Sequence, residues 1–329
     1  MNIIVLGAGS WGTALARLLC QNQHQVTLHS WMPEQIRDMQ ADGENKQFLP
    51  GAKLPPELTL TADMSAVSQA ELVLFAVPSP ALASVAAEAR PYLRPDTILV
   101  NVAKGFEQGG TRRLSQILAD TCPGHPCVVL SGPSHAEEVA LEHPTLVVVA
   151  GAELSILKRV QEAFSNSYFR VYTNSDVIGV EVGAAMKNVI ALCSGVLDGL
   201  GLGDNAKAAL MTRGLAEITR LGVAMGAKAA TFFGLAGMGD LIVTCTSRHS
   251  RNYRAGVRIG QGVPCQQVIE EMGMVVEGAY ATECVHRLSR LYQVDTPICD
   301  KCWQVLYEGA DPRTKMMELM NRSYRSEED

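Results

Sequence analysis

The feature that most constrains the fold is a set of three glycines near the start of the chain, Gly7, Gly9 and Gly12. They follow the apolar run 2–6, which is typical of a buried parallel strand, and precede the segment 13–19, which has a helical composition. Between a strand and a helix, the first glycine permits a tight bend, the second leaves room for a pyrophosphate and the third lets the helix pack on the strand. The motif therefore predicts a dinucleotide-binding turn with phosphates at the helix N-terminus, and an ordinary tight turn is the alternative.

Further apolar runs in the first half of the chain predict a sheet. The expected strands are 2–6, 25–29, 72–77, 97–102, 127–130, 145–149 and 168–172, and the proline-rich residues 41–60 are expected to form a loop. Because helical stretches alternate with these strands, we predict an α/β fold of the Rossmann type, with a mostly parallel sheet covered on both faces. Ligands of such sheets bind beyond the carboxyl ends of the strands, where Lys104 and residues 132–134 fall.

The sequence pattern changes near residue 178. From Gly179 onward the chain contains long stretches rich in Ala, Leu, Met and Gly with helical spacing, in place of alternating apolar and polar residues. We therefore predict two domains, a dinucleotide-binding Rossmann domain over residues 1–178 and an all-α helical domain over residues 179–329. The boundary is expected between residues 173 and 180.

Composition limits the classes of function. The chain carries 28 Lys and Arg against 34 Asp and Glu, a formal charge of −6, and has no basic block, so nucleic acid is not an expected partner. We expect no integral membrane segment, because the apolar runs look shorter than the roughly 18 residues of a span. A first strand at residue 2 leaves no room for a signal peptide, and nine scattered cysteines suit a reducing compartment. These features predict a cytoplasmic protein.

The pair Cys299 and Cys302 has the spacing of some metal and redox motifs. Such a role needs a second cysteine pair or a following strand and helix, and the sequence offers neither. We expect two ordinary thiols on a helix and no metal site, since no cluster of Cys and His offers one.

Lys187 is the first candidate for acid–base chemistry. It lies within the apolar segment 184–190, where a lysine either extends to solvent or is held in a cleft for a purpose. In a cleft of low polarity near other cations the charged form of a lysine is disfavoured, so the group can donate and recover a proton near neutral pH. We expect the adjacent Asn188 to hold Lys187 in place.

Two further segments place polar residues beside apolar ones. Asp240 follows a glycine turn and opens an apolar segment, so it is either the N-cap of a helix or a hydrogen-bond acceptor for Lys187 or a substrate hydroxyl. The cluster Ser250-Arg251-Asn252 is either a solvated loop or a phosphate clamp, since arginine matches phosphate oxygens with two parallel hydrogen bonds.

Ordered blocks along the whole chain add a family resemblance. They are GAGSWGTALA, the Lys104-Gly105 step, SGPSHAEE, GVEVGAAMKNVIAL, DGLGLGDNAKAALMTRGLAE, GLAGMGDLIVTCTSRHSRN and GMVVEG. In these blocks the sequence resembles the NAD(P)-dependent glycerol-3-phosphate dehydrogenases of bacteria. The resemblance implies reduction of dihydroxyacetone phosphate, a phosphorylated triose, to sn-glycerol 3-phosphate for phospholipid synthesis. It also implies a homodimer, with substrate and dimer contacts in the helical domain.

The resemblance also implies roles for single residues. Lys187 is implied as the catalytic acid/base and Lys104 as a group between cofactor and substrate; Thr244 matches a substrate-site threonine, and Asp240 and Asn188 are expected to orient Lys187. Substrate contacts are implied for Lys104, Gly132, Ser134, Lys187, Asp240, Ser250, Arg251 and Asn252. Cofactor contacts are expected, from the glycine motif and the resemblance together, for Gly7, Gly9, Ser10, Trp11, Gly12, Trp31, Lys104, Ala136, Arg251, Val275 and Glu277.

The residues after the second strand leave the choice between NADH and NADPH open. The acid that usually binds the ribose 2′-hydroxyl is absent, and Trp31-Met32 stand where members of this family often carry His-Arg. Ser30 bonds a hydroxyl or a phosphate weakly, the Trp31 ring fits adenine in either cofactor, and Arg37 is expected to be solvated. We therefore expect both NADH and NADPH to serve, with a discrimination below about 2 kcal/mol, or roughly thirtyfold.

Two alternative functions use many of the same features. Other hydroxy-acid and sugar-acid dehydrogenases share the architecture, but they are expected to carry a carboxylate site in place of Ser250-Arg251-Asn252. A nucleotide-sensing protein that has lost catalysis has no use for Lys187, and its presence counts against that alternative.

Overall fold

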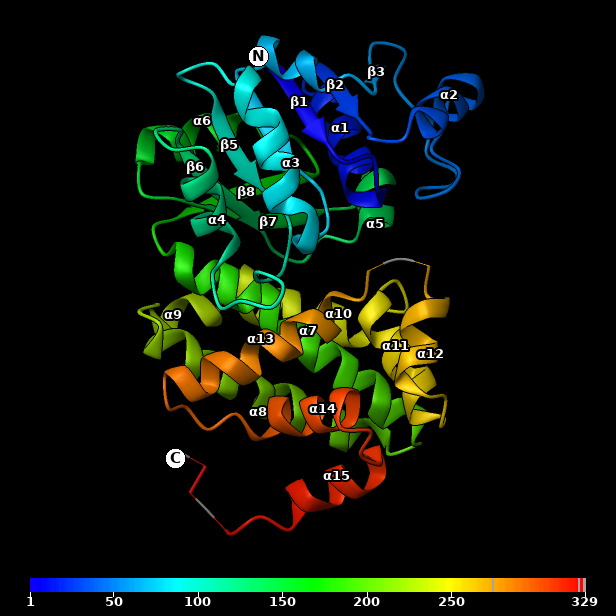
Figure 1. Cartoon of the computed structure of the whole chain (residues 1–329), viewed down its shortest axis with the longest axis vertical. Coiled ribbons are helices and arrows are strands. Elements are labelled where there is room, and N and C mark those ends of the chain that lie inside the picture. The colour runs from blue at the N-terminus through cyan, green and yellow to red at the C-terminus, as the bar shows by residue number, and fades with distance from the viewer. Residues whose placement is uncertain (274, 325, 328–329) are drawn as a thin grey trace.

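The computed structural model describes residues 1–273, 275–324 and 326–327. These residues form a sheet flanked by helices and, stacked on it along the long axis of the molecule, a bundle of helices (Figure 1). The N-terminus lies at the outer end of the sheet domain, and the last helix, α15 (Pro312–Met320), lies at the opposite end of the molecule (Figure 1).

The described part of the first half forms one sheet of eight strands. The strands are β1 (Asn2–Leu6), β2 (Gln25–His29), β3 (Thr59–Thr61), β4 (Leu72–Phe75), β5 (Ile98–Asn101), β6 (Cys127–Ser131), β7 (Thr145–Ala150) and β8 (Phe169–Asn174). They lie in the order β3-β2-β1-β4-β5-β6-β7-β8; β6 and β7 pair antiparallel and the other neighbours pair parallel. The predicted mostly parallel sheet is confirmed.

The strand order places a binding site beside the glycine turn. The chain passes from β1 to β2 on one side and returns to β4 on the other, so the order reverses between β1 and β4. Leu6, at the end of β1, pairs with both His29 and Phe75, which brings three strand ends level. Ligands of open α/β sheets bind at such a reversal, beyond the carboxyl ends of the strands.

Helices cover both faces of the sheet. They are α1 (Ser10–Gln21), α2 (Pro33–Asp42), α3 (Leu82–Ala89), α4 (Leu114–Thr121), α5 (Ala136–Ala140) and α6 (Leu154–Phe164), with short 3-10 turns η1 (Met64–Gln69), η2 (Ser79–Ala81) and η3 (Arg90–Tyr92). Ile3 and Val5 of β1 belong to the apolar cluster under α1 and α6, and Ile4 and Leu6 belong to the cluster under α3 and α4. Because successive side chains of a strand point to opposite faces, this central strand is buried from both sides.

The second half consists of helices around one buried central helix. The elements are α7 (Val177–Gly199), α8 (Gly203–Ala224), α9 (Ala229–Phe232), the π-helical turn η4 (Leu235–Gly239), α10 (Asp240–Thr246), α11 (Arg251–Gly260), α12 (Cys265–Glu271), α13 (Glu277–Leu291), α14 (Pro297–Tyr307) and α15 (Pro312–Met320). Helix α7 packs against α8, α10, α11 and α13. The predicted domain boundary after residue 178 lies in the first turn of α7.

Helices α7 and α11 approach each other through glycine. A β-carbon on Gly195 of α7 would lie 2.0 Å from the carbonyl oxygen of Tyr253, and one on Gly256 of α11 would lie 2.0 Å from that of Leu192. The two backbones therefore touch, which no larger side chain at these positions would allow. This contact places the start of α11 beside the middle of α7, where Lys187 lies.

The structure corrects two expectations. The expected loop 41–60 runs into β3, a strand of three residues beside β2 that is too short to show an alternating pattern. The expectation that every apolar run is too short to span a membrane is wrong, because Val177–Gly199 and Ala229–Thr246 are long and apolar enough by length and composition. In the first of these, 83% of the window is buried inside the protein, as in the core helix of a globular domain.

Candidate active site

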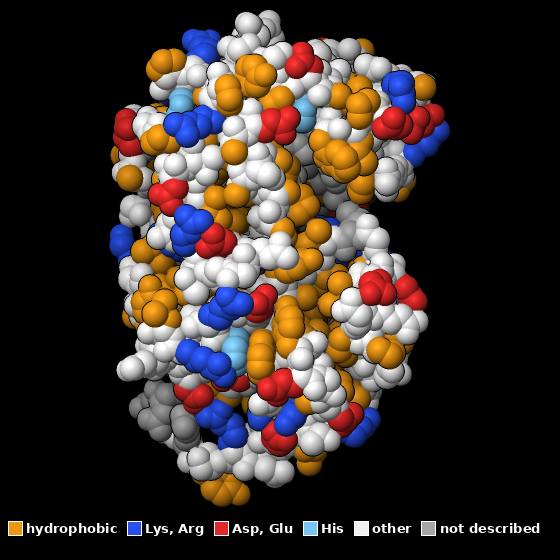
Figure 2. Space-filling model, in the orientation of Figure 1, with side chains coloured by type: hydrophobic (Ala, Val, Ile, Leu, Met, Phe, Trp, Pro, Cys, Tyr) orange, Lys and Arg blue, Asp and Glu red, His pale blue; other side chains and the backbone are white. Residues whose placement is uncertain are grey.

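The candidate site lies where the sheet domain meets the helical domain. The carboxyl ends of the central strands are directed toward the helices (Figure 1). Figure 2 shows the surface hollowed between the two domains on one side of the molecule. The residues singled out from the sequence come to this region from both domains.

The three glycines have the geometry that a tight turn requires. Gly7 has a φ of +111°, and a β-carbon on it would lie 2.6 Å from the carbonyl oxygen of Ala76. A β-carbon on Gly12 would lie 1.9 Å from the carbonyl oxygen of Gly7, so α1 packs directly on the turn. In front of Gly9, by contrast, no atom of the described chain lies within 4 Å of an added β-carbon. The turn therefore keeps open space at its second glycine.

The start of α1 fits the pyrophosphate of a dinucleotide. Gly9 is the N-cap, so the cap position has no side chain, and the first amides of a helix lack partners within it. Trp11 adds a buried indole Nε1–H for which the described residues provide no hydrogen-bond partner. Free amides, a positive helix end and an unpaired donor suit an anion.

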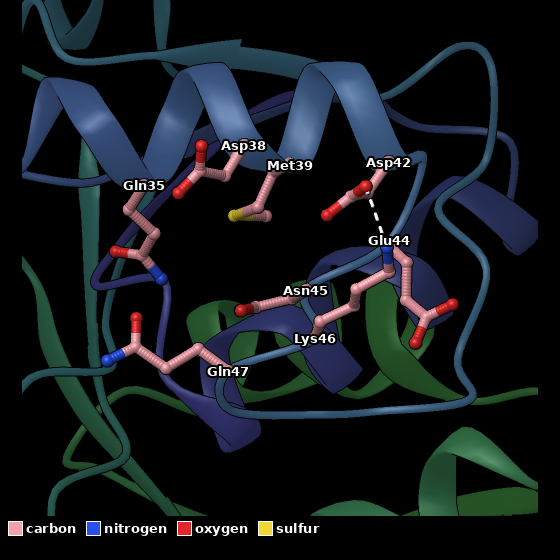
Figure 3. Close-up of a pocket in the computed structure, with 8 residues that line it drawn as sticks. All are labelled: Gln35, Asp38, Met39, Asp42, Glu44, Asn45, Lys46 and Gln47. Atoms are coloured by element: carbon pink, nitrogen blue, oxygen red, sulfur yellow. Dashed lines mark hydrogen bonds and ion pairs between the residues drawn. The ribbon is translucent and has the colours of Figure 1, made fainter.

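A buried polar network supports the turn from behind, and sequence reasoning missed it. The carbonyl oxygen of Ala8 accepts hydrogen bonds from Gln35 Nε2 at 2.7 Å and from Asn45 Nδ2 at 2.9 Å. Asn45 also donates to Thr13 Oγ1 at 2.8 Å, and the Ser30 hydroxyl donates to Gln35 Oε1 at 2.6 Å. Figure 3 shows Gln35 on α2 and Asn45 in the loop that follows, on the walls of a small pocket. Gln35 and Asn45 are polar residues of a helix and a loop, and nothing in the sequence indicates that their side chains are buried.

The proton-transfer candidate Lys187 is almost fully buried, with 5% of its surface exposed. Its Nζ donates to Asp240 Oδ1 and to Thr244 Oγ1, both at 2.6 Å, and Thr244 Oγ1 donates to the Asp240 carbonyl at 2.6 Å. Asp240 and Thr244 lie one turn apart in α10, which packs on α7. Of the two interpretations of Asp240, the structure shows the acceptor for Lys187; the N-cap of α10 is Gly239.

A second lysine shares the same carboxylate. Lys104, which follows β5, donates from Nζ to Asp240 Oδ2 at 2.8 Å, to the Gly132 carbonyl at 2.8 Å and to Ser134 Oγ at 3.3 Å. One buried carboxylate thus bridges two ammonium groups from different domains. Burial of such ions is tolerated only where hydrogen bonds satisfy them, as they do here.

The cluster shifts the pKa of both partners. Burial lowers the pKa of Lys187 to about 8, against the opposing attraction of Asp240 and with a further lowering by the charge of Lys104. Although burial favours the neutral acid, the charges of Lys104 and Lys187 lower the pKa of Asp240 below its usual value. Lys187 therefore titrates near neutral pH beside a carboxylate that stays charged, which is the condition for a general acid and base.

Asn188 has a different role from the expected one. Its Nδ2 donates to the Lys104 carbonyl at 3.1 Å, and its Oδ1 accepts from Asn252 Nδ2 at 2.9 Å. Asn252 Oδ1 in turn accepts from the Gly278 amide at 2.9 Å. The expectation that Asn188 holds Lys187 is thus wrong, since neighbouring positions of a helix point about 100° apart. The two amides instead tie α7, α11 and α13 to the segment after β5.

The predicted phosphate cluster lies at the start of α11. Ser250 is the N-cap, and its hydroxyl accepts from the Tyr253 amide at 3.2 Å. Arg251 is partly buried and donates from Nη1 to the Val275 carbonyl at 3.3 Å. The Asn252 side chain is engaged by Asn188 and Gly278. A ligand bound at the start of α11 would therefore meet the Arg251 guanidinium and the amides of the first turn.

Glu277, expected on the cofactor side, joins the two domains. It begins α13, and its carboxylate accepts hydrogen bonds from the amide of Ser79 at 3.0 Å and from the Ser79 hydroxyl. Burial raises the pKa of Glu277, while the bonds from Ser79 oppose that shift. Ser79 follows β4 within the Pro-Ser-Pro segment and was not singled out from the sequence.

The remaining predicted residues lie around this centre or away from it. Ala136 begins α5, two residues after Ser134. Trp31 follows β2 with 81% of its surface exposed, and Arg37 forms an exposed ion pair with Glu34. Cys299 and Cys302 are buried in α14, and within the described residues no group of three His, Cys, Asp or Glu could hold a metal.

Comparison with known proteins covers both domains. Residues 2–156 match the N-terminal family model of NAD-dependent glycerol-3-phosphate dehydrogenase, and residues 176–317 match the C-terminal model. A curated glycerol-3-phosphate dehydrogenase with NAD(P)+ specificity from Desulfitobacterium hafniense is 53% identical over 99% of this chain and 92% of its own length. One from Enterococcus faecalis is 49% identical over 99% of this chain and 97% of its own length.

Solved structures agree with the sequence matches. A crystal structure of glycerol-3-phosphate dehydrogenase from Coxiella burnetii is 38% identical and superposes with a TM-score of 0.94, over 98% of this chain and 99% of that one. A ketopantoate reductase from Ralstonia eutropha, at 17% identity and a TM-score of 0.61, shares the fold alone. Matches over both domains, together with a glycine turn in the sheet domain and a buried lysine in the helical domain, show that the chain belongs to the NAD-dependent glycerol-3-phosphate dehydrogenase family.

Proposed function

We propose that this chain catalyses the reversible reduction of dihydroxyacetone phosphate to sn-glycerol 3-phosphate. The observation that carries the proposal is Lys187, a buried ammonium with a pKa of about 8, held by Asp240 and Thr244 where Lys104 of the sheet domain meets the same carboxylate. The names of the relatives support the substrate, and the Arg251 segment at the start of α11 supports its phosphate.

The cofactor would be held mainly by the sheet domain. The first amides of α1 and the Trp11 indole would bind the pyrophosphate, in the space kept open at Gly9. Glu277 and Arg251 come from the helical domain and would bind on the other side. When bound, a reduced nicotinamide supplies a hydride to the substrate carbonyl carbon.

Lys187 and Lys104 would act on the substrate oxygen. As negative charge develops on the carbonyl oxygen, both ammonium groups stabilise it, and in a cleft with little water this stabilisation is large. A proton then moves from Lys187 Nζ to that oxygen, which leaves neutral Lys187 and an alcohol. Asp240 holds both Nζ atoms, so it sets their separation and remains an anion throughout.

Three wider expectations belong to the proposal. A cytoplasmic location, a place in phospholipid synthesis and a homodimer follow from the family resemblance and from a composition without a basic block. Sedimentation of the purified chain checks the dimer, since a mass near twice 35.4 kDa is expected. A mass that stays at the monomer value at micromolar concentration contradicts it.

The test of the proposed reaction is a set of initial rates. Dihydroxyacetone phosphate, unphosphorylated dihydroxyacetone and a 2-oxo acid are each offered with NADH and with NADPH. We expect turnover of the phosphorylated triose with both nicotinamides and much weaker turnover of the other two substrates. Faster turnover of the 2-oxo acid would assign the chain to the hydroxy-acid dehydrogenases instead.

A further inference from the structure

A pair of histidines lies at the site and has no part in the mechanism above. His135 is the N-cap of α5 and follows Ser134, whose hydroxyl lies 3.3 Å from Lys104 Nζ. His249 precedes Ser250, the N-cap of α11. The two imidazole rings have centroids 5.7 Å apart and are tilted by 49°. Because α5 belongs to the sheet domain and α11 to the helical domain, the pair brings the two domains together at this point.

The surroundings of His135 link it to the reacting cluster. Its Nε2 lies 3.5 Å from the carbonyl of Val243 in α10, the residue before Thr244. Lys187 of α7 and Lys104 after β5 act on the ring as positive charges, and Glu137 of α5 acts as a negative one. Burial first, and then the charge of Lys187, hold the pKa of His135 below its usual value. The imidazole is therefore neutral near pH 7 when the cleft holds no anion.

Charged residues at the starts of α5 and α11 also interact. Arg251, two residues after His249, is acted on by Glu137, two residues after His135, and by Glu277 of α13. The start of α5 therefore carries a charge that acts on Arg251, the side chain expected to receive a phosphate. A dianion there favours the charged form of an imidazole within about 4–6 Å. The first amides of α11, which has ten residues, add to the same field.

We propose that His135 and His249 form a second arm of the substrate-phosphate site and that His135 takes up a proton as the phosphate dianion binds. The proposal rests on the proposed reduction of dihydroxyacetone phosphate. Arg251 stays charged across the physiological range, so its arm does not change with pH there. Phosphate binding by the imidazole arm strengthens as pH falls, so substrate affinity is coupled to proton uptake.

Calorimetry of inorganic phosphate binding tests the proposal without turnover. The full chain is titrated at pH 6.5, 7.5 and 8.5 in two buffers of different ionisation enthalpy, which separates proton uptake from binding heat. The variants are His135→Phe, His135→Gln, His249→Phe and the double variant, with His143→Phe as a control on an exposed histidine beyond α5. The ionisation of phosphate itself is common to all of them and cancels in the comparison.

At pH 6.5 we expect the wild-type chain and His143→Phe to bind phosphate about tenfold more tightly than the double variant, the effect of losing one charge-assisted hydrogen bond. They also take up more protons, and the difference in affinity shrinks toward pH 8.5. Equal affinity and equal proton uptake in the wild type and the double variant overturn the proposal. If His135→Phe does not fold, His135→Gln and the exposed His249 position provide the same comparison.

Kinetics separate phosphate binding from positioning of Lys187. The expected change in the His135 variants is a rise of about tenfold in KM for dihydroxyacetone phosphate at pH 6.5, with a much smaller change in kcat. A fall in kcat at unchanged KM would mean that His135 acts through Lys187, and it overturns the phosphate arm. Absence of wild-type turnover would refute the proposed function alone, because the calorimetric result does not depend on it.

Discussion

The glycine turn after β1 and the lysine cluster around Asp240 belong to one site but are built in different ways. The turn comes from six consecutive residues, and what it offers a ligand is backbone amides and empty space at Gly9. The cluster is made of side chains from distant segments, Lys104, Lys187 and Asp240, which meet only in the folded chain. One region works through shape and the other through charge.

This difference determines what each region tolerates. In the turn, an added methyl group destabilises the fold wherever another atom already occupies its place, whether that atom is polar or apolar. In the cluster a change of shape matters less than the loss of one ion, because the remaining buried ions are then uncompensated. Substitutions of matched size should therefore separate the two regions, and the following variants are ordered by the size of the expected effect.

The largest effect is expected for Lys187→Met, which removes the proton donor and keeps an apolar stem of similar length. A general acid contributes about 10²- to 10⁴-fold in rate, so kcat should fall by that order. Binding of NADH, followed by fluorescence, should remain nearly unchanged, because the turn is intact. The control is Lys207→Met on α8, which removes a lysine paired with Asp198 at the end of α7. A Lys187→Met variant that keeps a tenth of the activity would falsify the assignment.

Asp240→Asn tests the charge of the cluster at constant shape. Breaking a buried ion pair on one side costs about 3–5 kcal/mol of unfolding free energy, measured by denaturant titration. In the wild type the rate of ketone reduction should fall as pH rises through about 8, because Lys187 must carry its proton. Asp240 raises the pKa of Lys187, so in the variant the fall moves to lower pH. Asp42→Asn, which breaks an exposed pair with Lys46, should change neither quantity.

Arg251→Ala tests the phosphate arm of the helical domain. Removing one partner of a buried charge pair costs about 2–5 kcal/mol. KM for dihydroxyacetone phosphate should rise far more than KM for unphosphorylated dihydroxyacetone. Arg258→Ala on the same helix, which loses only an exposed pair with Glu271, is the control. Equal losses on both substrates would show that Arg251 serves the fold or the cofactor.

Gly12→Ala and Gly9→Ala separate packing from ligand space within the turn. In Gly12→Ala the new methyl group meets the Gly7 carbonyl, and we expect a loss of about 1–3 kcal/mol in stability, as for overpacking. Gly9→Ala should leave the melting temperature nearly unchanged and weaken NADH binding, because only a ligand occupies that space. If Gly9→Ala binds NADH as tightly as the wild type, the pyrophosphate lies elsewhere.

The smallest effect concerns cofactor choice. Arg37 forms only an exposed ion pair with Glu34, and the Ser30 hydroxyl donates to Gln35, so neither side chain is held in place for a 2′-phosphate. We expect a wild-type preference below about 2 kcal/mol, and Met32→Arg should shift the ratio of kcat/KM values toward NADPH. The control is Gln40→Arg, at an exposed position of α2. Met39 of the same helix is buried and would not be a suitable control position. A wild-type preference above a hundredfold contradicts the expectation.

The sequence by itself determined the local parts of this protein. Spacing of Gly7, Gly9 and Gly12 between an apolar strand and a helix was enough to predict the turn, because backbone conformation and close packing are set by consecutive residues. The same holds for the order of strands and helices and for Lys187 within an apolar helix. The three residues of β3 were too few to show a strand pattern, so the sequence predicted a loop there. For α7, the apolar sequence was expected to be too short for a membrane span, and that expectation was wrong.

Only the tertiary structure decided which side chains meet. The sharing of Asp240 between two lysines, the pairing of Asn188 with Asn252 and the support of the turn by Gln35 each join residues from separate segments. Hydrogen bonds and pKa shifts depend on distances of a few ångströms and on burial, and neither is encoded by spacing along the chain. Asn188 shows this most simply: one step along α7 from Lys187, it points to a different neighbour and serves a different contact.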